Sequence, residues 1–266
     1  MFVDSHCHLD FPELSERFDA ILENMAANDV GRALCISVTL PDFPRVLATA
    51  ERDARLHASV GVHPDYVDTE EPDVARLVRL ADHPKIVGIG ETGLDYYREQ
   101  GDDEAARQRF RSRQQERFRV HIRAARATGK PLIVHTRAAS SDTLRLMREE
   151  GADACGGVMH CFTEDWETAR GALDLGFHIS FSGIVTFRNA QSLRDVAAKV
   201  PIDRMLIETD SPYLAPVPFR GRTNEPGFVR HVAERLAELR QLPLEVVGDV
   251  TTRNYLRLFR IEEAAP

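Results

Sequence analysis

The feature that most constrains the fold is a regular alternation of two kinds of segment along the chain. Short runs of β-branched and apolar residues lie at positions 2–3, 33–38, 58–62, 86–89, 132–134, 157–159, 177–181 and 205–207. Stretches with charged residues at helical spacing separate them, at positions 16–28, 43–54, 74–81, 104–128, 141–149, 165–175 and 190–199. This alternation is typical of parallel β-α units, whose sheet is covered by helices.

Eight such runs predict an α/β fold of the (β/α)8 TIM-barrel type, which typically needs about 250 residues. The chain has 266 residues, so we expect a single barrel domain over residues 1–266. An open doubly wound sheet is the alternative, but the turns after the first runs lack the G-x-G-x-x-G motif that usually supports it. Two more helical stretches, 227–240 and 244–259, follow the last run beyond a longer loop at 211–226.

Charge and hydropathy narrow the class of protein. The formal net charge of −8 argues against a broad basic surface for nucleic acid but allows a local basic groove. The arginines between positions 107 and 126 are interleaved with Phe110 and Phe118 near helical spacing, which favours a packing helix with a solvated basic face. No apolar run approaches the roughly 18 to 20 residues that cross a bilayer. The N-terminal residues do not resemble a secretory signal, so we expect a cytoplasmic protein with no membrane contact and no obligate protein partner.

Residues that can bind metal follow the apolar runs, at the points where the strands are expected to end. His6 and His8 follow the first run, and later runs are followed by His63, Glu91, His135, His160, Glu208 and Asp210. The carboxyl ends of barrel strands form one rim, where barrel enzymes carry their active sites. Because side chains alternate along a strand, His6 and His8 face one side while Cys7 turns away. These residues are therefore expected to meet in one site.

The residue types indicate a metal centre. Imidazole and carboxylate groups are the ligands that zinc, manganese and similar divalent ions take in proteins. A catalytic ion keeps one position open for water, so the candidate ligands exceed what one ion needs. We expect two divalent metal ions, Mg²⁺, Mn²⁺ or Zn²⁺, with Glu91 as the bridge between them. The candidate metal ligands are His6, His8, Glu91, His135, His160 and Asp210.

Several segments carry a resemblance to a known family. They are FVDSHCHLD at 2–10, GVHP at 61–64, IGETGLDYY at 89–97, PLIVHTR at 131–137, HCF at 160–162, SGIVTFRNA at 182–190, IETDSPYLAP at 207–216 and NEPGFV at 224–229. In this order, across nearly the whole chain, they are similar to the TatD family of metal-dependent deoxyribonucleases, within the amidohydrolase-like barrel superfamily. An ordered set of segments is far more specific than one H-x-H motif.

The resemblance implies an activity and a role for each candidate residue. It implies hydrolysis of phosphodiesters by a metal-activated water, as in a 3′ to 5′ exonuclease acting on the 3′ ends of DNA, preferably single-stranded, with RNA as a further substrate. One ion would lie among His6, His8, Glu91 and Asp210, and the second among Glu91, His135 and His160. The expected catalytic residues are Asp210, Glu208 and His63, and the expected substrate contacts are Arg137, Asn224 and Glu225.

Two alternatives stay open from the sequence. The first keeps the metals and changes the substrate to a small ester, lactone or amide, because a fold does not fix a function. Relatives of that kind often bridge their metals with a modified lysine, and here no lysine occupies a strand end. The second is a non-catalytic binding protein, which would have no need of so many converging ligands.

Overall fold

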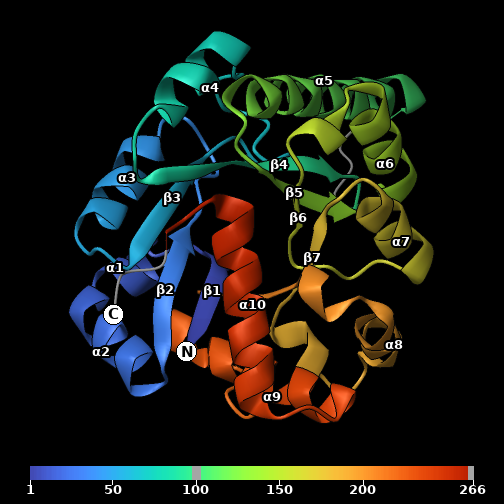
Figure 1. Cartoon of the computed structure of the whole chain (residues 1–266). Helices are drawn as coiled ribbons and strands as arrows, with labels where there is room; N and C mark the ends of the chain where they lie inside the picture. Colours follow the sequence, from blue (N-terminus) through green and yellow to red (C-terminus); the bar gives the residue numbers. More distant parts are fainter. Residues whose placement is uncertain (98–102, 263–266) are drawn as a thin grey trace.

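The computed structural model describes residues 1–97 and 103–262, and its strands form a barrel surrounded by helices (Figure 1). The strands are β1 (Phe2–Cys7), β2 (Val30–Cys35), β3 (Leu56–Val60), β4 (Ile86–Asp95), β5 (Leu132–Arg137), β6 (Gly157–Met159), β7 (His178–Phe181) and β8 (Met205–Ile207). They are paired in sequence order, and every pair between β1 and β8 is parallel. The predicted (β/α)8 barrel is confirmed. The predicted single domain includes residues 98–102 and 263–266, which lie outside the described residues.

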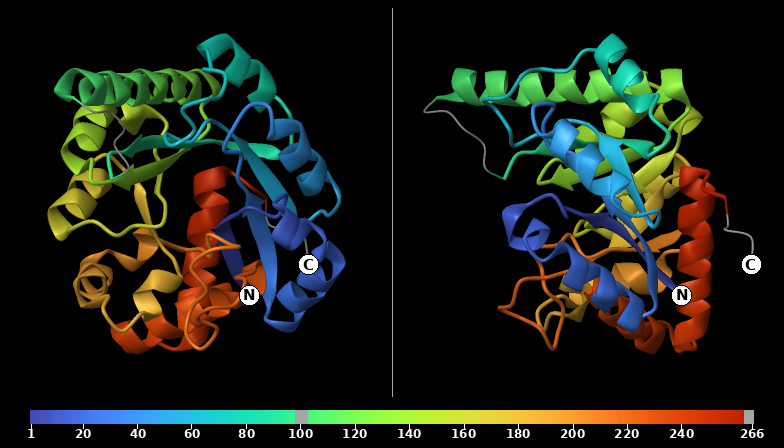
Figure 2. Two further views of the ribbon diagram at one scale, coloured as in Figure 1. Left: turned by 180° about the vertical axis from the view of Figure 1, so that it is seen from behind. Right: turned by 90° about the vertical axis from the view of Figure 1, so that its left-hand side faces the viewer.

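Helices cover the outside of the barrel in all three views (Figures 1 and 2). The α-helices of the described residues are α1 (Pro12–Ser15), α2 (Phe18–Ala27), α3 (Phe43–Glu51), α4 (Val74–Ala81), α5 (Glu104–Thr128), α6 (Ser140–Glu149), α7 (Trp166–Asp174), α8 (Gln191–Lys199), α9 (Val229–Arg240) and α10 (Leu244–Phe259). Aspartates cap several of them: the side chain of Asp103 accepts the Ala106 N–H at 2.7 Å, and Asp165 accepts the Thr168 N–H at 2.8 Å. Such caps satisfy backbone donors that have no partner inside the helix.

The barrel closes between β1 and β8 through an irregular seam rather than a long ladder. The Asp210 N–H donates to the His6 carbonyl and the His8 N–H to the Ser211 carbonyl, both at 2.9 Å. The Asp4 carboxylate accepts two bonds from Thr209, one from its N–H at 2.9 Å and one from its hydroxyl at 2.6 Å. The seam therefore fixes the backbone of the same segments that carry His6, His8 and Asp210.

The helix α10 covers the end of the barrel where the strands begin. Its residues Tyr255, Leu256 and Phe259 pack with apolar residues that lie in the strands, such as Val3 and Leu206. In Figure 1 this helix crosses in front of the ring of strands. Because the strands are parallel, the polar residues at their carboxyl ends lie together at the opposite end of the barrel.

The strand β4 is longer than its apolar run predicts. The run ends at residue 89, whereas β4 continues to Asp95 and pairs with β5 along that extension. Gly93 makes the extension possible: it has φ +128°, and a side chain there would begin 1.9 Å from the carbonyl oxygen of His135. Only glycine lets the two backbones approach so closely, and the extension brings Asp95 level with Arg137 at the end of β5.

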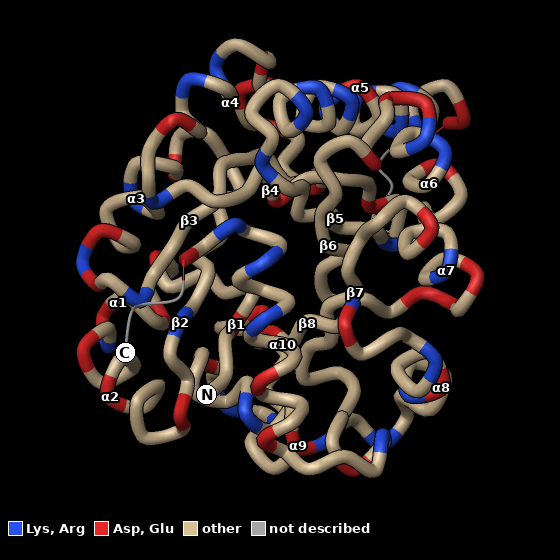
Figure 3. The backbone as a smooth tube through the Cα atoms, in the orientation of Figure 1, with Lys and Arg blue, Asp and Glu red and all other residues tan. Residues whose placement is uncertain are grey.

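The arginine-rich helix α5 packs on the barrel and pairs with acidic neighbours. Phe118 is fully buried on its inner face. Arg117 contacts Glu71 at 2.7 Å, and Arg123 contacts Glu150 at 3.0 Å. Figure 3 shows basic and acidic residues intermixed along this helix and its neighbours. This arrangement agrees with a packing helix rather than a groove for nucleic acid. Among the described residues, no helix combines the length and apolar composition needed to cross a membrane.

Candidate metal centre

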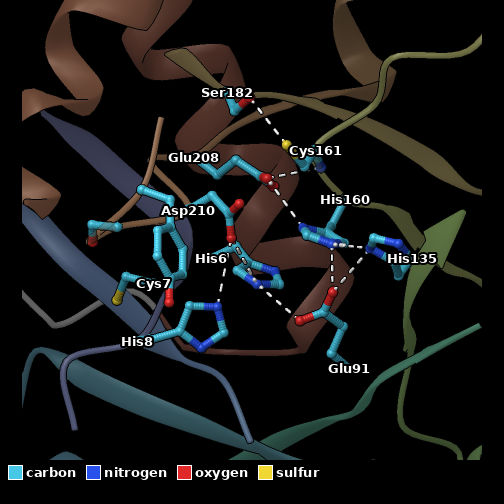
Figure 4. Close-up of polar contacts among 12 residues, drawn as sticks. His6, Cys7, His8, Glu91, His135, His160, Cys161, Ser182, Glu208 and Asp210 are labelled. Carbon is cyan, nitrogen blue, oxygen red and sulfur yellow. Dashed lines mark hydrogen bonds and ion pairs between the residues drawn. The ribbon is translucent and has the colours of Figure 1, made fainter. Parts of the chain in front are cut away.

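The predicted metal ligands converge at the carboxyl ends of the strands (Figure 4). His6 lies near the end of β1 and His8 just beyond it, Glu91 and His135 lie in β4 and β5, and His160 and Asp210 follow β6 and β8. A cavity of about 780 Å³ opens onto this cluster, and it is lined by His8, His63, Glu91, His135, His160 and Asp210. His6 is fully buried beside them. The structure thus brings all six predicted ligands into one place.

Glu91 lies at the centre of the cluster, and its two oxygens face different groups. Its Oε1 is 2.7 Å from Nε2 of His160 and 3.3 Å from Nδ1 of His135. Its Oε2 is 3.4 Å from Nε2 of His6. A carboxylate with one oxygen toward each of two imidazole sets has the geometry of a bridging ligand.

Asp210 completes the side of the cluster nearest β1. Its Oδ1 lies 3.5 Å from Nε2 of His6 and 3.5 Å from Nε2 of His8. The residue has φ +57°, a left-handed conformation that costs a non-glycine residue roughly 1 kcal/mol or more and that aspartate tolerates better than most. Ala138 and Cys161, just after β5 and β6, also have positive φ. Strained backbone of this kind gathers at functional sites, where it aims side chains.

The unpaired nitrogen atoms of the cluster fit a metal ion. Within the described residues, both ring nitrogens of His6 and Nδ1 of His8 are buried without a hydrogen-bond partner. Two ligand atoms at about 2.1 Å from a tetrahedral ion lie roughly 3.4 Å apart. The His6–Glu91 separation of 3.4 Å and the His8–Asp210 separation of 3.5 Å match that spacing and are too long for strong hydrogen bonds. The donor set therefore fits divalent ions.

The spacing of ligand atoms reproduces the predicted grouping only in part, because Asp210 is in none of the sets found among the described residues and His160 is grouped with His6 and Glu208. In the described part of the chain, there are three sets of ligand atoms that lie within 4.8 Å of one another: His6, His8 and Glu91; His63, Glu91 and His135; and His6, His160 and Glu208. Glu91 is shared by the first two sets, as expected for the bridge. His63 and Glu208, which were not predicted as ligands, appear in the second and third.

The electrostatics of the cluster favour ionised carboxylates. Burial alone raises the pKa of Glu91, but the surrounding imidazoles, above all His160, outweigh it and hold that pKa well below its usual value. For Asp210, burial is likewise outweighed by the neighbouring imidazoles of His8, His6 and His160, so its pKa is also lowered. Both groups are therefore anionic at neutral pH.

The imidazoles respond to the same charges in different ways. Burial lowers the pKa of His6 and lowers the pKa of His63 to about 3. For His135, burial is outweighed by Asp95 and Glu91, which raise its pKa to about 9. His6 also stacks on His160 with ring centroids 3.9 Å apart, so two positive charges there would repel. The imidazole rings therefore do not fully neutralise the buried carboxylates, and a divalent cation can provide the missing positive charge.

Two further carboxylates orient the histidines from behind. Oδ2 of Asp95 lies 3.0 Å from Nε2 of His135, and Oε1 of Glu208 lies 3.2 Å from Nδ1 of His160. The other ring nitrogen of each histidine faces Glu91. Such carboxylate–histidine pairs are typical of histidines that bind metal ions. Glu208 is among the site residues predicted from the sequence, and Asp95 is not. A signal was available, because Asp95 lies four positions after Glu91 on one strand and thus on the same face.

His63 lies at the edge of the cluster with a fixed ring orientation. Its Nδ1 accepts the backbone N–H of Asp65 at 3.1 Å, so the proton of the neutral ring is on Nε2. That Nε2 faces Oε1 of Glu91 at 3.4 Å. His63 therefore presents an N–H donor to the cavity rather than a lone pair, which is consistent with contact to substrate rather than to metal.

The three predicted substrate contacts lie in different places. Arg137 is exposed, lines the cavity and stacks on Tyr97, with its guanidinium 3.8 Å from the ring centroid. Asn224 is fully buried and donates to the carbonyl oxygens of Thr209 and Tyr213. Only Arg137 of the three lines the cavity.

Glu225 also lies away from the cavity. It is 5% exposed and contacts Arg17 at 3.2 Å and the side-chain amide of Asn24. Glu225 and Asn224 therefore hold the 211–226 loop against the barrel in this structure, which differs from the substrate contact that the resemblance implies.

Known proteins resemble this chain over nearly its whole length. The family model described as TatD related DNase matches residues 3–260. The chain is 51% identical to YcfH of Escherichia coli strain K12, over 98% of this chain and 96% of that protein, and 39% identical to YabD of Bacillus subtilis strain 168, over 98% and 100%. Both relatives are described only as uncharacterized metal-dependent hydrolases.

A solved structure gives the same result. The crystal structure of YJJV, a TatD homolog from Escherichia coli K12, superposes with a TM-score of 0.87 at 30% identity and covers 98% of each chain. The family model spans almost all of the chain, and the relatives match over nearly their full lengths. The chain belongs to the TatD related DNase family and is a metal-dependent hydrolase.

Proposed function

We propose that the protein is a deoxyribonuclease that removes nucleotides from the 3′ ends of DNA, preferably single-stranded, in the 3′ to 5′ direction. The observation that carries this proposal is Glu91, whose two oxygens face two separate sets of imidazoles at the floor of an open cavity. Arg137 lines the same cavity and offers planar N–H donors that suit a phosphodiester. The family description agrees with a nuclease.

The proposed ligands are His6, His8, Glu91 and Asp210 for one divalent ion and Glu91, His135 and His160 for a second, each ion being Mg²⁺, Mn²⁺ or Zn²⁺. Paired divalent ions lower the pKa of a water toward neutrality and neutralise charge on a phosphoryl group. The buried carboxylates behind His135 and His160 hold those rings in place.

The protein's own groups supply the proton transfers and orientation. Asp210 is anionic and its side chain is 17% exposed toward the cavity, so it can take the proton from the attacking water. His63 can donate its Nε2 proton in a hydrogen bond to a phosphoryl oxygen. Glu208 acts through His160, whose Nδ1 it contacts, rather than on the substrate. The proposed enzyme is a single domain, and its cytoplasmic location stays a prediction from the sequence.

The decisive experiment compares substrates directly. Metal-loaded protein is incubated with single strands labelled at the 3′ or the 5′ end, beside a panel of lactones, amides and simple esters. The proposal expects early loss of the 3′ label, no reaction with chelator and no reaction for Glu91→Ala. Hydrolysis of a lactone or amide without cleavage of DNA would refute the nuclease assignment and favour the small-molecule alternative.

A further inference from the structure

Three aromatic residues are linked to residues of the metal cluster by the same type of backbone turn. Each lines the cavity, follows a cluster residue by three positions and donates its backbone N–H to the carbonyl of that residue. The pairs are Phe11 with His8 at 3.0 Å, Tyr66 with His63 at 3.3 Å, and Tyr213 with Asp210 at 3.0 Å. A single tight turn therefore fixes the place of each ring relative to the site.

The rings occupy one arc of the cavity mouth. They follow β1, β3 and β8, and the strands β8, β1, β2 and β3 are consecutive around the barrel. Phe11 stacks on His8 with centroids 4.8 Å apart at 21°, and Tyr213 meets Phe11 edge-on at 6.4 Å. Tyr66 meets His63 edge-on at 6.0 Å. The three rings thus form a continuous aromatic arc with the histidines of the cluster, from the cluster toward the outside of the cavity.

Two of these rings are unusually open to solvent. Tyr213 is 55% exposed and Tyr66 is 39% exposed. Large aromatic side chains normally gain stability by burial, so an exposed group of them at a cavity marks a surface that binds something. Neither ring is needed to fill the core. Their exposure leaves ring faces available to a ligand.

The opposite side of the cavity carries a positive charge. Arg137 lies at the end of β5, across the barrel from β1, and its guanidinium lies over the ring of Tyr97. Within the described residues, Arg137 has no carboxylate within ion-pair distance. The cavity therefore offers aromatic surface on one side, a cation on the other and anionic ligands of a metal centre between them.

We propose that Phe11, Tyr66 and Tyr213 are the base-binding surface of the enzyme, on which unpaired nucleobases of a DNA end stack while Arg137 contacts the backbone phosphate. This inference rests on the proposed nuclease function and adds the residues that select a single-stranded end. Every base has a π-face, so stacking tolerates any sequence. Inside a duplex each base is stacked on both faces, and only the outer face of the terminal pair is open, so several successive bases can reach these rings only after they unpair.

The test compares a normal single strand with an abasic one. Both oligonucleotides carry the same phosphates, but the second lacks the bases of its last three nucleotides at the 3′ end. For each protein, the measured quantity is the ratio of kcat/KM on the normal strand to kcat/KM on the abasic strand. The variants are Tyr213→Leu and Tyr66→Leu, with Tyr213→Phe to restore a ring. Val246→Ala, an exposed apolar residue in α10 outside the cavity, is the matched control.

Base stacking is worth roughly 1–3 kcal/mol per base, so the ratio should fall by roughly 5- to 150-fold in each leucine variant. Tyr213→Phe should keep most of the ratio and Val246→Ala all of it. Melting temperatures close to that of the native protein show that the variants are folded, as expected for exposed positions.

The possible failures are distinct. A ratio near one in the native protein, or an unchanged ratio in both leucine variants, would overturn the base-binding surface while leaving the nuclease intact. Absence of cleavage of either strand by the metal-loaded native protein would instead overturn the proposed function, and the inference with it.

Discussion

Asp95 is not among the site residues predicted from the sequence, but the geometry indicates that it orients His135. Its Oδ2 accepts Nε2–H of His135 at 3.0 Å, and its Oδ1 accepts the N–H of Tyr97 at 2.9 Å. Both oxygens are therefore occupied by donors, and the side chain is only 2% exposed. An amide in the same place can accept from one donor only, so Asp95→Asn leaves either His135 or the backbone N–H facing an NH2 group.

The expected loss follows from that mismatch. Without its acceptor, the His135 ring can rotate or move its proton to Nδ1, the nitrogen that faces Glu91, and either change removes a ligand. Loss of such a partner typically weakens metal binding 10- to 100-fold, which corresponds to about 1.4–2.7 kcal/mol. We expect Asp95→Asn to bind Mn²⁺ or Zn²⁺ more weakly by that factor.

The assay is calorimetric titration of metal-free protein, or competition with a chromophoric chelator. Glu234→Gln is the matched control, because Glu234 also contacts a histidine, His231 at 2.8 Å, but on the outer helix α9. The control should bind metal like the native protein. If Asp95→Asn also binds metal with native affinity while folding normally, the idea that Asp95 positions His135 is wrong.

Three other predictions concern stability. His121 is fully buried, accepts the Val62 N–H at 3.0 Å, and burial lowers its pKa from 6.5 to about 4. The unfolded chain therefore takes up this proton first as the pH falls, so unfolding free energy should drop by up to about 3 kcal/mol between pH 6.5 and pH 4, and His121→Gln should reduce that slope in urea titrations. Asp4→Ala removes the acceptor of both Thr209 bonds at the barrel seam and should cost roughly 2–5 kcal/mol in the same assay; no loss would mean that the seam does not depend on it. Glu225→Ala should lower the melting temperature without raising KM. A raised KM at unchanged stability would instead show that Glu225 contacts the substrate.

The sequence predicts the barrel well because its signal is local and repeated. The helix predicted at 104–128 matches α5, and the run at 205–207 matches β8. The predictions are weaker where polar or glycine residues continue a strand. The extension of β4 beyond residue 89 depends on how closely Gly93 approaches His135, a contact between strands that no local pattern contains. The predicted strand at 33–38 is displaced from β2, Val30–Cys35, because apolar residues continue past the end of the ladder.

The sequence predicts which residues meet in the site, but the detailed arrangement of their side chains depends on the fold. That His6, Glu91 and Asp210 approach one another follows from the rim of a parallel barrel. The sequence does not show that each oxygen of Glu91 faces a different side, since this depends on the path of β4. Nor does it show that Asn224 turns into the protein, because a loop residue can face either way until its neighbours are placed.

The most direct test of the metal centre is a crystal structure of the protein grown with Mn²⁺, with anomalous difference density measured at the manganese edge. The account predicts two peaks on either side of the Glu91 carboxylate, one near His6 and His8 and the other near His135 and His160, each about 2–2.5 Å from its ligand atoms. Density elsewhere, or none between these side chains in crystals that contain the metal, would contradict it.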